Sequence, residues 1–248
     1  MEFDRFKQDT FKPGMDPPKS APGSVDTWSY STIKKFEECP YSVYLSKVEK
    51  MPRAESNAAD RGTRIHQEAE DYLIGNDDKL PESLSKFTTD FEMLRGMYNE
   101  GIVEVEEDWG FTREWNICEW EDDDIWGKMK LDSFINFPDD CATVIDFKTG
   151  RKFGNEIKHT DQGIFYTVGA FMRYPQEVNA VQVEFWYLDK GVKLVKYYTR
   201  EEGTYLIRNV ERRATALTTA TTFEPTPSKE TCRWCDHNIN DNCDFAVR

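Results

Sequence analysis

Long apolar runs are missing from this sequence. No stretch approaches the roughly 18 consecutive apolar residues that cross a bilayer, so we expect neither a membrane span nor a membrane partner. Residues 1–26 are rich in charge, glycine and proline and lack the apolar core of a signal peptide. We therefore expect residues 1–27 to form a flexible arm, and the protein to act in the cytoplasm.

Positive charge is also scarce. Lys and Arg number 32 against 46 Asp and Glu, and a net charge of −14 argues at first against a nucleic-acid partner. The excess is local, however, because residues 100–124 hold eleven acidic residues against one cation, Arg113. This segment is interpreted as a solvated excursion or, less favoured, as the docking surface for a protein partner. Local basic surfaces suffice for DNA. The candidates for DNA contact are Lys34, Lys35, Arg61, Arg64, Arg151 and Lys152.

Histidine is rare, with three residues, and the six cysteines are unevenly spaced. Cys232, Cys235 and Cys243 cluster near the C-terminus, which in a reducing compartment indicates metal ligation. A four-coordinate site needs one further ligand. Cys39 would complete a Cys₄ set suited to a [4Fe–4S] cluster, whereas His237 would complete a Cys₃His zinc site. The spacing alone does not decide between them.

The spacing of apolar residues predicts the order of helices and strands. Apolar residues at helical spacing predict helices over 29–38, 58–74, 84–98, 161–173 and 201–218. Aromatic and β-branched runs predict strands over 111–120, 125–137, 142–147, 181–188 and 192–198. We therefore expect an α/β domain over residues 28–222, with a central mixed sheet flanked by helices. Residues 223–248 would form a cysteine-rich tail.

The strongest chemical signal is the run VIDFKTG at residues 144–150. Side chains alternate along a strand, so Asp146 and Lys148 lie on the same face. A carboxylate beside an ammonium suits phosphodiester hydrolysis, because the carboxylate holds Mg²⁺ or Mn²⁺ while the lysine orients or deprotonates the attacking water. Asp132 lies fourteen residues before Asp146, a spacing that lets the two carboxylates meet across a hairpin.

Two further motifs accompany this pair. His66 ends the run RGTRIH on the second predicted helix, and Gln162 and Tyr166 are four residues apart on a later one. Residues at that separation share one face of a helix. Taken singly, each of these residues is more typical of an ordinary helix surface.

Together, in this order, the motifs resemble the RecB-like branch of the PD-(D/E)XK nucleases. That branch includes CRISPR-associated exonucleases, the AddB nuclease domain and related phage exonucleases. The resemblance runs from about residue 29 to 243 and begins with WSYSTI and FEECP at residues 28–40. It departs from the family where Gly127 precedes Asp132 by five positions and where Asp146 replaces a frequent Glu.

The resemblance implies a restriction-endonuclease-like core and a role for each motif residue. The Mg²⁺ or Mn²⁺ ligands would be His66, Asp132, Asp146 and the backbone carbonyl of Phe147. Lys148 would be the catalytic lysine, supported by Gln162 and Tyr166. Iron–sulfur members of the family take one cysteine from the N-terminal Cys-Pro motif and three from the C-terminus. The resemblance therefore favours a cluster held by Cys39, Cys232, Cys235 and Cys243.

The function implied by the resemblance is that of a DNA exonuclease. It would act on single strands or duplex ends in recombination, repair or phage DNA metabolism, in a bacterial or phage-infected cell. The alternative is a non-catalytic DNA-binding or adaptor protein that keeps the fold. The intact set of Asp132, Asp146 and Lys148 argues against that alternative.

Overall fold

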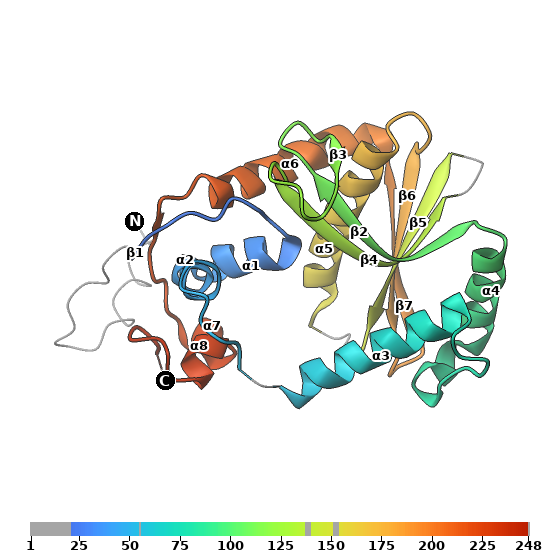
Figure 1. Ribbon diagram of the computed structural model, residues 1–248, viewed down its shortest axis with the longest axis horizontal. Coiled ribbons are helices and arrows are strands. Elements are labelled where there is room, and N and C mark those ends of the chain that lie inside the picture. Colours follow the sequence, from blue (N-terminus) through green and yellow to red (C-terminus); the bar gives the residue numbers. More distant parts are fainter. Residues whose placement is uncertain (1–20, 55, 137–139, 151–153, 248) are drawn as a thin grey trace, which may run out of the picture. The chain divides into compact units, whose positions relative to one another are not determined.

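The computed structural model describes residues 21–54, 56–136, 140–150 and 154–247. The chain divides into two compact units, one formed by Met1–Glu55 with Arg213–Arg248 and the other by Ser56–Arg212. Figure 1 labels their helices and strands. Most of the predicted N-terminal arm (residues 1–20) and two of the predicted DNA contacts, Arg151 and Lys152, lie outside the described residues.

The larger unit is built on a six-stranded sheet with the order β3-β2-β4-β5-β6-β7. The strands are β2 (Val103–Phe111), β3 (Ile117–Cys118), β4 (Gly127–Asn136), β5 (Cys141–Lys148), β6 (Ala180–Tyr187) and β7 (Val192–Thr199). Neighbouring strands are antiparallel except β5 and β6, which run parallel and are joined across the sheet by a helix. The predicted mixed α/β fold is confirmed. The apolar run at the start of β5 is buried, as expected for a central strand covered on both faces.

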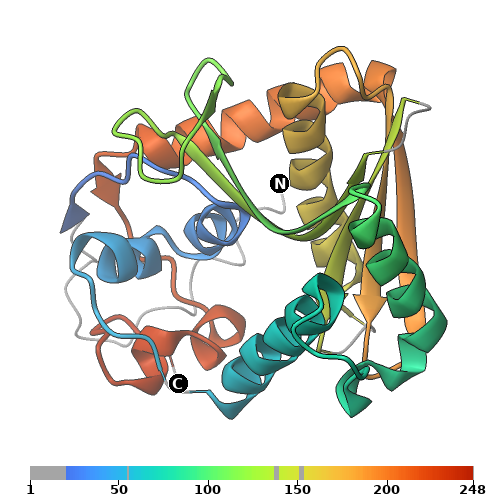
Figure 2. The same cartoon turned by 45° about the vertical axis from the view of Figure 1, so that its right-hand side comes forward.

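Helices cover both faces of this sheet (Figure 2). They are α3 (Asn57–Ile74), η2 (Glu82–Phe87), α4 (Thr88–Asn99) and α5 (Glu156–Arg173), followed by α6 (Arg200–Thr218). One core cluster joins α3 and α4 to Ile145 and Phe147 of β5. On α5, Gly163 packs against Val183 and Phe185 of β6. Within the described residues, no helix combines the length and apolar character needed to cross a membrane.

Helix α3 follows its sequence signals closely. The side chain of Ser56 caps its N-terminus by accepting a hydrogen bond from the Ala59 amide. Gly75 ends it with φ 90°, a left-handed conformation that glycine adopts without strain. Ile65 and Ala69 lie four residues apart on its buried face. His66 follows Ile65 directly, and its ring lies beside Asp132 of β4.

Two predicted elements differ from the structure. The helix predicted over 84–98 begins as the 3₁₀ helix η2 and becomes α-helical only at Thr88. The strand predicted over 111–120 is wrong: the long strand is β2, which ends at Phe111. A tight turn follows, closed by the Trp115 amide donating to the Thr112 carbonyl at 3.0 Å. The aromatic residues of 111–120 suggest a strand by composition, but they pack around this turn instead, with Trp115 against Trp126.

The acidic segment 100–124 is therefore only partly a solvated excursion. Nine of its residues form β2, which pairs along its length with β4. The expectation of a wholly solvated segment was wrong because alternation in VEVEE places valines inward and carboxylates between them.

The smaller unit brings together the two ends of the described chain. It contains β1 (Ala21–Pro22), α1 (Tyr30–Glu38), α2 (Pro40–Val43), η1 (Tyr44–Val48), β8 (Thr222–Phe223), α7 (Lys229–Arg233) and α8 (Asp236–Ile239). Strand β1 pairs antiparallel with β8. The guanidinium of Arg213, almost fully buried, donates to both carboxylate oxygens of Glu37 at 2.6 and 2.9 Å.

Candidate active site

Four side chains at the end of β5 and on α5 form a closed ring of polar contacts. Lys148 lies 2.6 Å from Oδ1 of Asp146 and donates to Oε1 of Gln162 at 3.0 Å. The Gln162 amide in turn donates to the Tyr166 hydroxyl at 2.7 Å. Tyr166 closes the ring by donating to Oδ2 of Asp146 at 2.7 Å. The contacts of Lys148 with Asp146 and Gln162 fix the position of its ammonium.

Burial keeps the Tyr166 hydroxyl of this ring protonated. Asp146 and Tyr166 are buried. Burial, and then the charges of Asp146 and Asp132, raise the pKa of Tyr166 well above its usual value. Tyr166 therefore stays protonated and acts as a hydrogen-bond donor to Asp146 at any physiological pH.

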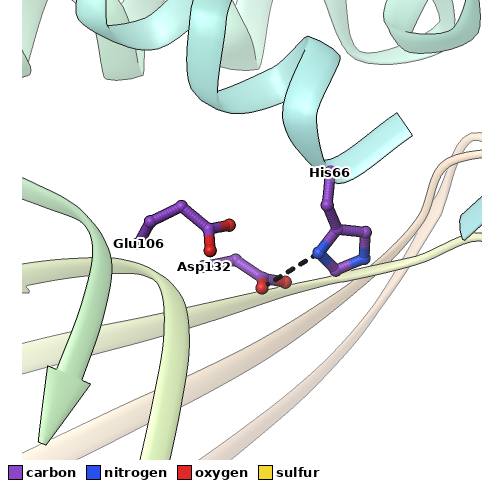
Figure 3. A group of neighbouring side chains, drawn as sticks. All are labelled: His66, Glu106 and Asp132. Atoms are coloured by element: carbon purple, nitrogen blue, oxygen red, sulfur yellow. Dashed lines mark hydrogen bonds and ion pairs between the residues drawn. The ribbon is translucent and has the colours of Figure 1, made fainter. Parts of the chain in front are cut away.

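A second group lies beside the ring: His66 of α3, Glu106 of β2 and Asp132 of β4. Figure 3 shows the three side chains turned toward one another from separate elements. One ligand atom from each residue lies within 4.8 Å of the others. His66 Nδ1 is 3.1 Å from Oδ1 of Asp132. Imidazole nitrogen with two carboxylate oxygens is a donor set that suits a divalent cation such as Mn²⁺.

Asp132 connects this group to β5. Its Oδ2 accepts a hydrogen bond of 2.6 Å from the backbone amide of Phe147, the residue between Asp146 and Lys148. One carboxylate oxygen of Asp132 therefore contacts His66, and the other contacts the backbone of β5 between Asp146 and Lys148. Among the described residues, the groups whose ligand atoms lie within 4.8 Å of one another do not include Asp146, whose oxygens face Lys148 and Tyr166.

The electrostatics of the group favour a bound cation. Burial and then the charge of Asp146 raise the pKa of Asp132, although the hydrogen bond from His66 lowers it. Burial and then the charge of Asp132 also raise the pKa of Glu106. Burial alone lowers the pKa of His66, but the hydrogen bond to Asp132 and the charges of nearby carboxylates outweigh it and raise that pKa to about 9. Partly buried carboxylates that repel one another are stabilised when a divalent cation binds between them. The residues present therefore fit such an ion.

Glu106 is the site residue that sequence reasoning missed. The pairing of β2 with β4 is interrupted at this position, between Val105↔Ser133 and Glu107↔Leu131. Glu106 has φ 52°, which is uncommon for a residue other than glycine and is often found at functional sites. No pattern within its own segment points to Glu106, because its place in the site depends on the pairing of β2 with β4 and on this local break.

The four predicted DNA-contacting cations that the structure describes already have partners within the protein. Arg61 makes a two-pronged ion pair with Asp189, at 2.6 and 3.1 Å, and Arg64 lies 3.0 Å from Glu68. In the smaller unit, Lys34 lies 3.4 Å from Glu37 and Lys35 lies 3.3 Å from Asp236. Their role in DNA binding stays a prediction.

The four cysteines predicted to bind a metal group line one pocket in the smaller unit, together with His237. Burial, with a smaller contribution from the charges of the other three thiolates, raises the pKa of Cys243 to about 11. His237 is buried, with Nε2 3.1 Å from the Ser42 carbonyl and 2.8 Å from the Ser46 hydroxyl. Since a carbonyl only accepts, Nε2 carries the proton, and Nδ1 is the nitrogen left for a metal.

The ring around Lys148 and the group of His66, Glu106 and Asp132 lie within the range matched by a known family. The family model described as "PD-(D/E)XK nuclease superfamily" matches residues 27–239. The chain belongs to this superfamily. Membership indicates metal-dependent nuclease activity, with DNA as the substrate and a divalent metal as cofactor.

The other comparisons add little to this assignment. This PD-(D/E)XK protein is similar to a solved structure titled "Crystal structure of SSO0001", with 14% sequence identity and a TM-score of 0.44. The similarity covers 92% of this chain and 90% of that one. No curated protein matches the sequence.

Proposed function

We propose that this protein is a Mg²⁺- or Mn²⁺-dependent deoxyribonuclease of the RecB-like branch, acting as an exonuclease on single strands or duplex ends. The observation that carries the proposal is the placement of Lys148. Its ammonium is held between Asp146 and Gln162, while Asp132 links the same strand to His66 and Glu106. A lysine fixed beside a set of metal ligands suits phosphodiester hydrolysis, because metal and ammonium both stabilise the negative charge that develops on the phosphate.

Each residue of the site has a defined task in this proposal. His66, Glu106 and Asp132 would hold the divalent ion, with Asp146 and the carbonyl of Phe147 completing its shell. The ion, when bound, supplies Lewis-acid activation of the scissile phosphate. Lys148 orients the attacking water and offsets the negative charge that grows on the phosphate oxygens. Gln162 and Tyr166 keep the ammonium and the Asp146 carboxylate in place.

Exonuclease action can be separated from endonuclease action with matched substrates. A linear single strand labelled at one end and a covalently closed single-stranded circle of the same sequence are incubated with the protein and Mn²⁺. The proposal predicts that the linear strand is degraded from an end while the circle stays intact. Cleavage of the circle at a similar rate would replace the exonuclease by an endonuclease. Absence of cleavage on both, and on a linear duplex of the same sequence, would favour the adaptor alternative.

We also propose that the cysteine pocket holds a [4Fe–4S] cluster through Cys39, Cys232, Cys235 and Cys243. The pocket brings Cys39 of the Cys-Pro motif together with the three C-terminal cysteines, which are the four thiols that such a cluster needs. His237 lines the same pocket, so a zinc ion held by three cysteines and His237 is the alternative.

Absorbance and two substitutions separate the metal alternatives. Protein purified without oxygen should be brown, and Cys39→Ser should abolish the colour and lower thermal stability, whereas His237→Ala should retain the colour. Colourless protein with one zinc per chain, sensitive to His237→Ala but not to Cys39→Ser, would replace the cluster by zinc. Either result leaves the nuclease proposal unaffected.

A further inference from the structure

Helix α5 carries a third polar side chain on the face that holds Gln162 and Tyr166. His159 lies three residues before Gln162 and seven before Tyr166, so the three side chains share one side of the helix. Its Nδ1 lies 2.6 Å from the hydroxyl of Tyr187 on β6. The imidazole is thus fixed against the sheet one helical turn from Gln162, and the proposed nuclease mechanism leaves it without a role.

His159 lies beside Lys148, on the side of β5 away from the proposed metal ligands. In the parallel ladder of β5 and β6, Tyr187 is the register partner of Lys148. The buried ring of Phe185 contacts both groups: the Lys148 ammonium lies 5.5 Å from its centroid, and the His159 ring stacks on it with centroids 5.5 Å apart. Because β4 and β6 flank β5 on opposite sides, Lys148 lies between Asp132 and His159.

The contact with Tyr187 determines which nitrogen of His159 carries the proton. A phenol hydroxyl is a stronger hydrogen-bond donor than a neutral imidazole N–H, and an imidazole nitrogen is a better acceptor than a phenol oxygen. Burial, followed by the charges of Glu156 and Asp146, raises the pKa of Tyr187 and keeps this hydroxyl protonated. Tyr187 therefore donates to Nδ1, and the proton of the neutral imidazole is on Nε2.

The Nε2 atom of His159 is left as a hydrogen-bond donor that a ligand can reach. It makes no hydrogen bond to any residue that the structure describes, and it does not belong to the buried polar atoms that lack a partner. The side chain as a whole is only partly buried. Burial, followed by the charge of Lys148, lowers the pKa of His159 to about 4, so the ring is neutral at physiological pH. A neutral N–H beside an ammonium can bind an anionic oxygen without competing with the charge of Lys148.

We propose that Nε2 of His159 donates a hydrogen bond to the DNA phosphate next to the scissile one, on the side of Lys148 away from the metal. The inference rests on the proposed nuclease function, which places the scissile phosphate between Lys148 and the metal ligands. A hydrogen bond to a charged phosphate oxygen is stronger than one to a neutral acceptor. Tyr187 holds the edge of the imidazole and Phe185 its face, so the donor is oriented before the substrate binds.

The test compares a variant that keeps the ring of His159 with one that keeps its donor. His159→Phe retains an aromatic ring against Phe185 but has no N–H, whereas His159→Gln carries an amide donor near the position of Nε2. Both are made in the full-length protein, and thermal melting checks their folding. His159→Ala replaces His159→Phe if the phenyl ring lowers the melting temperature. Cleavage of a single-stranded oligonucleotide in Mn²⁺ gives KM and kcat for each protein.

The expected result is a loss of substrate binding that the amide restores. His159→Phe should raise KM by about 10-fold with kcat within about twofold of the wild type, as expected for loss of one hydrogen bond to a charged group, and His159→Gln should recover most of this loss. Gln162→Ala, on the same helix face, should instead lower kcat, because Gln162 acts through Lys148. A folded His159→Phe protein with the KM of the wild type would overturn the proposal, and so would a folded His159→Gln protein that binds no better than His159→Phe.

Uncharged linkages in the DNA identify the phosphate that His159 contacts. The scissile linkage is located from the first product of the wild type, and a methylphosphonate is placed at the linkage on either side of it. One of the two should raise KM of the wild type by about 10-fold and have little further effect in His159→Phe, because both changes remove the same hydrogen bond. Effects that multiply in the variant would contradict this contact.

The same measurements separate this inference from the nuclease proposal. A wild-type protein that cuts neither single-stranded nor duplex DNA in Mn²⁺ would contradict both. A working nuclease whose KM changes neither with His159→Phe nor with either methylphosphonate would contradict only the contact of His159 with DNA.

Discussion

The ammonium of Lys148 donates a hydrogen bond of 3.0 Å to the side-chain oxygen of Gln162. Gln162 is therefore more than a neighbour of the catalytic strand, because it fixes the direction from which Lys148 can reach a substrate. The same amide donates to Tyr166, so one side chain orients two others.

Replacing Gln162 should test this positioning. We expect Gln162→Ala to lower kcat by about 10- to 100-fold, as loss of a supporting contact around a metal centre does, with Mn²⁺ affinity almost unchanged. Gln67→Ala on α3, which removes an exposed glutamine bonded to Glu70, is the matched control. Steady-state cleavage of a labelled oligonucleotide measures both variants. Equal kcat in the two would remove Gln162 from the site.

Glu106 should contribute to metal binding. Because its carboxylate lies at ligand distance from the imidazole of His66 and the carboxylate of Asp132, Glu106→Gln should weaken Mn²⁺ binding by about 10- to 100-fold in a calorimetric titration. Glu107→Gln, one residue later on the same strand, carries the same loss of charge and should bind Mn²⁺ like the wild type. If both variants bound equally well, the metal would be held by Asp132 and Asp146 without Glu106.

The sequence predicts those site residues whose positions are set within a single strand or helix. Asp146 and Lys148 follow from strand alternation, and Gln162 and Tyr166 from the spacing of one helix face, and the structure brings all four into contact. Glu106 depends on which strand lies beside β4 and on a local break in pairing with φ 52°. Both are tertiary features that no pattern in one segment records.

The fold, too, was predictable where local patterns determine it and not where contacts between distant segments do. The strands 125–137, 142–147, 181–188 and 192–198 were predicted within a few residues, because their apolar and β-branched runs are long. The strand at 111–120 was misplaced because the aromatic residues there serve a turn and a ring cluster instead of a ladder. The antiparallel pairing of β1 with β8 joins residues some 200 positions apart, which composition cannot indicate.

His159 should make stability depend on pH in the acidic range. Burial, followed by the charge of Lys148, lowers the pKa of His159 from 6.5 to about 4. Its ring accepts or donates a hydrogen bond of 2.6 Å with Tyr187 and stacks on Phe185. Between pH 6.5 and 4 the unfolded chain therefore binds a proton that the folded protein does not, and stability falls as the pH falls through this window.

Urea unfolding above and within that window measures the effect. The wild type should lose more unfolding free energy on acidification than His159→Gln, which has no titrating ring. Parallel losses in the two proteins would show that His159 is not held neutral by the fold.

The packing of α5 on the sheet leaves no room at Gly169. An added Cβ there would lie 2.5 Å from the sulfur of Met129 and 3.4 Å from Trp109, so Gly169→Ala should destabilise the protein by about 1–3 kcal/mol. Gly96 on α4 has no neighbouring atom within 4 Å, and Gly96→Ala should stabilise by about 0.5–1 kcal/mol. Denaturant unfolding of both variants checks the contrast, and a stabilising Gly169→Ala would contradict the described approach of α5 to β4.

The rate at which Lys148→Ala cleaves end-labelled DNA in Mn²⁺ tests the central claim most directly. Lys148 is placed by Asp146 and Gln162 to stabilise charge in the transition state, so its removal should lower kcat by about 100-fold or more while thermal stability and DNA affinity stay close to those of the wild type. A folded Lys148→Ala protein that cut the same DNA at the wild-type rate would contradict the assignment of this site.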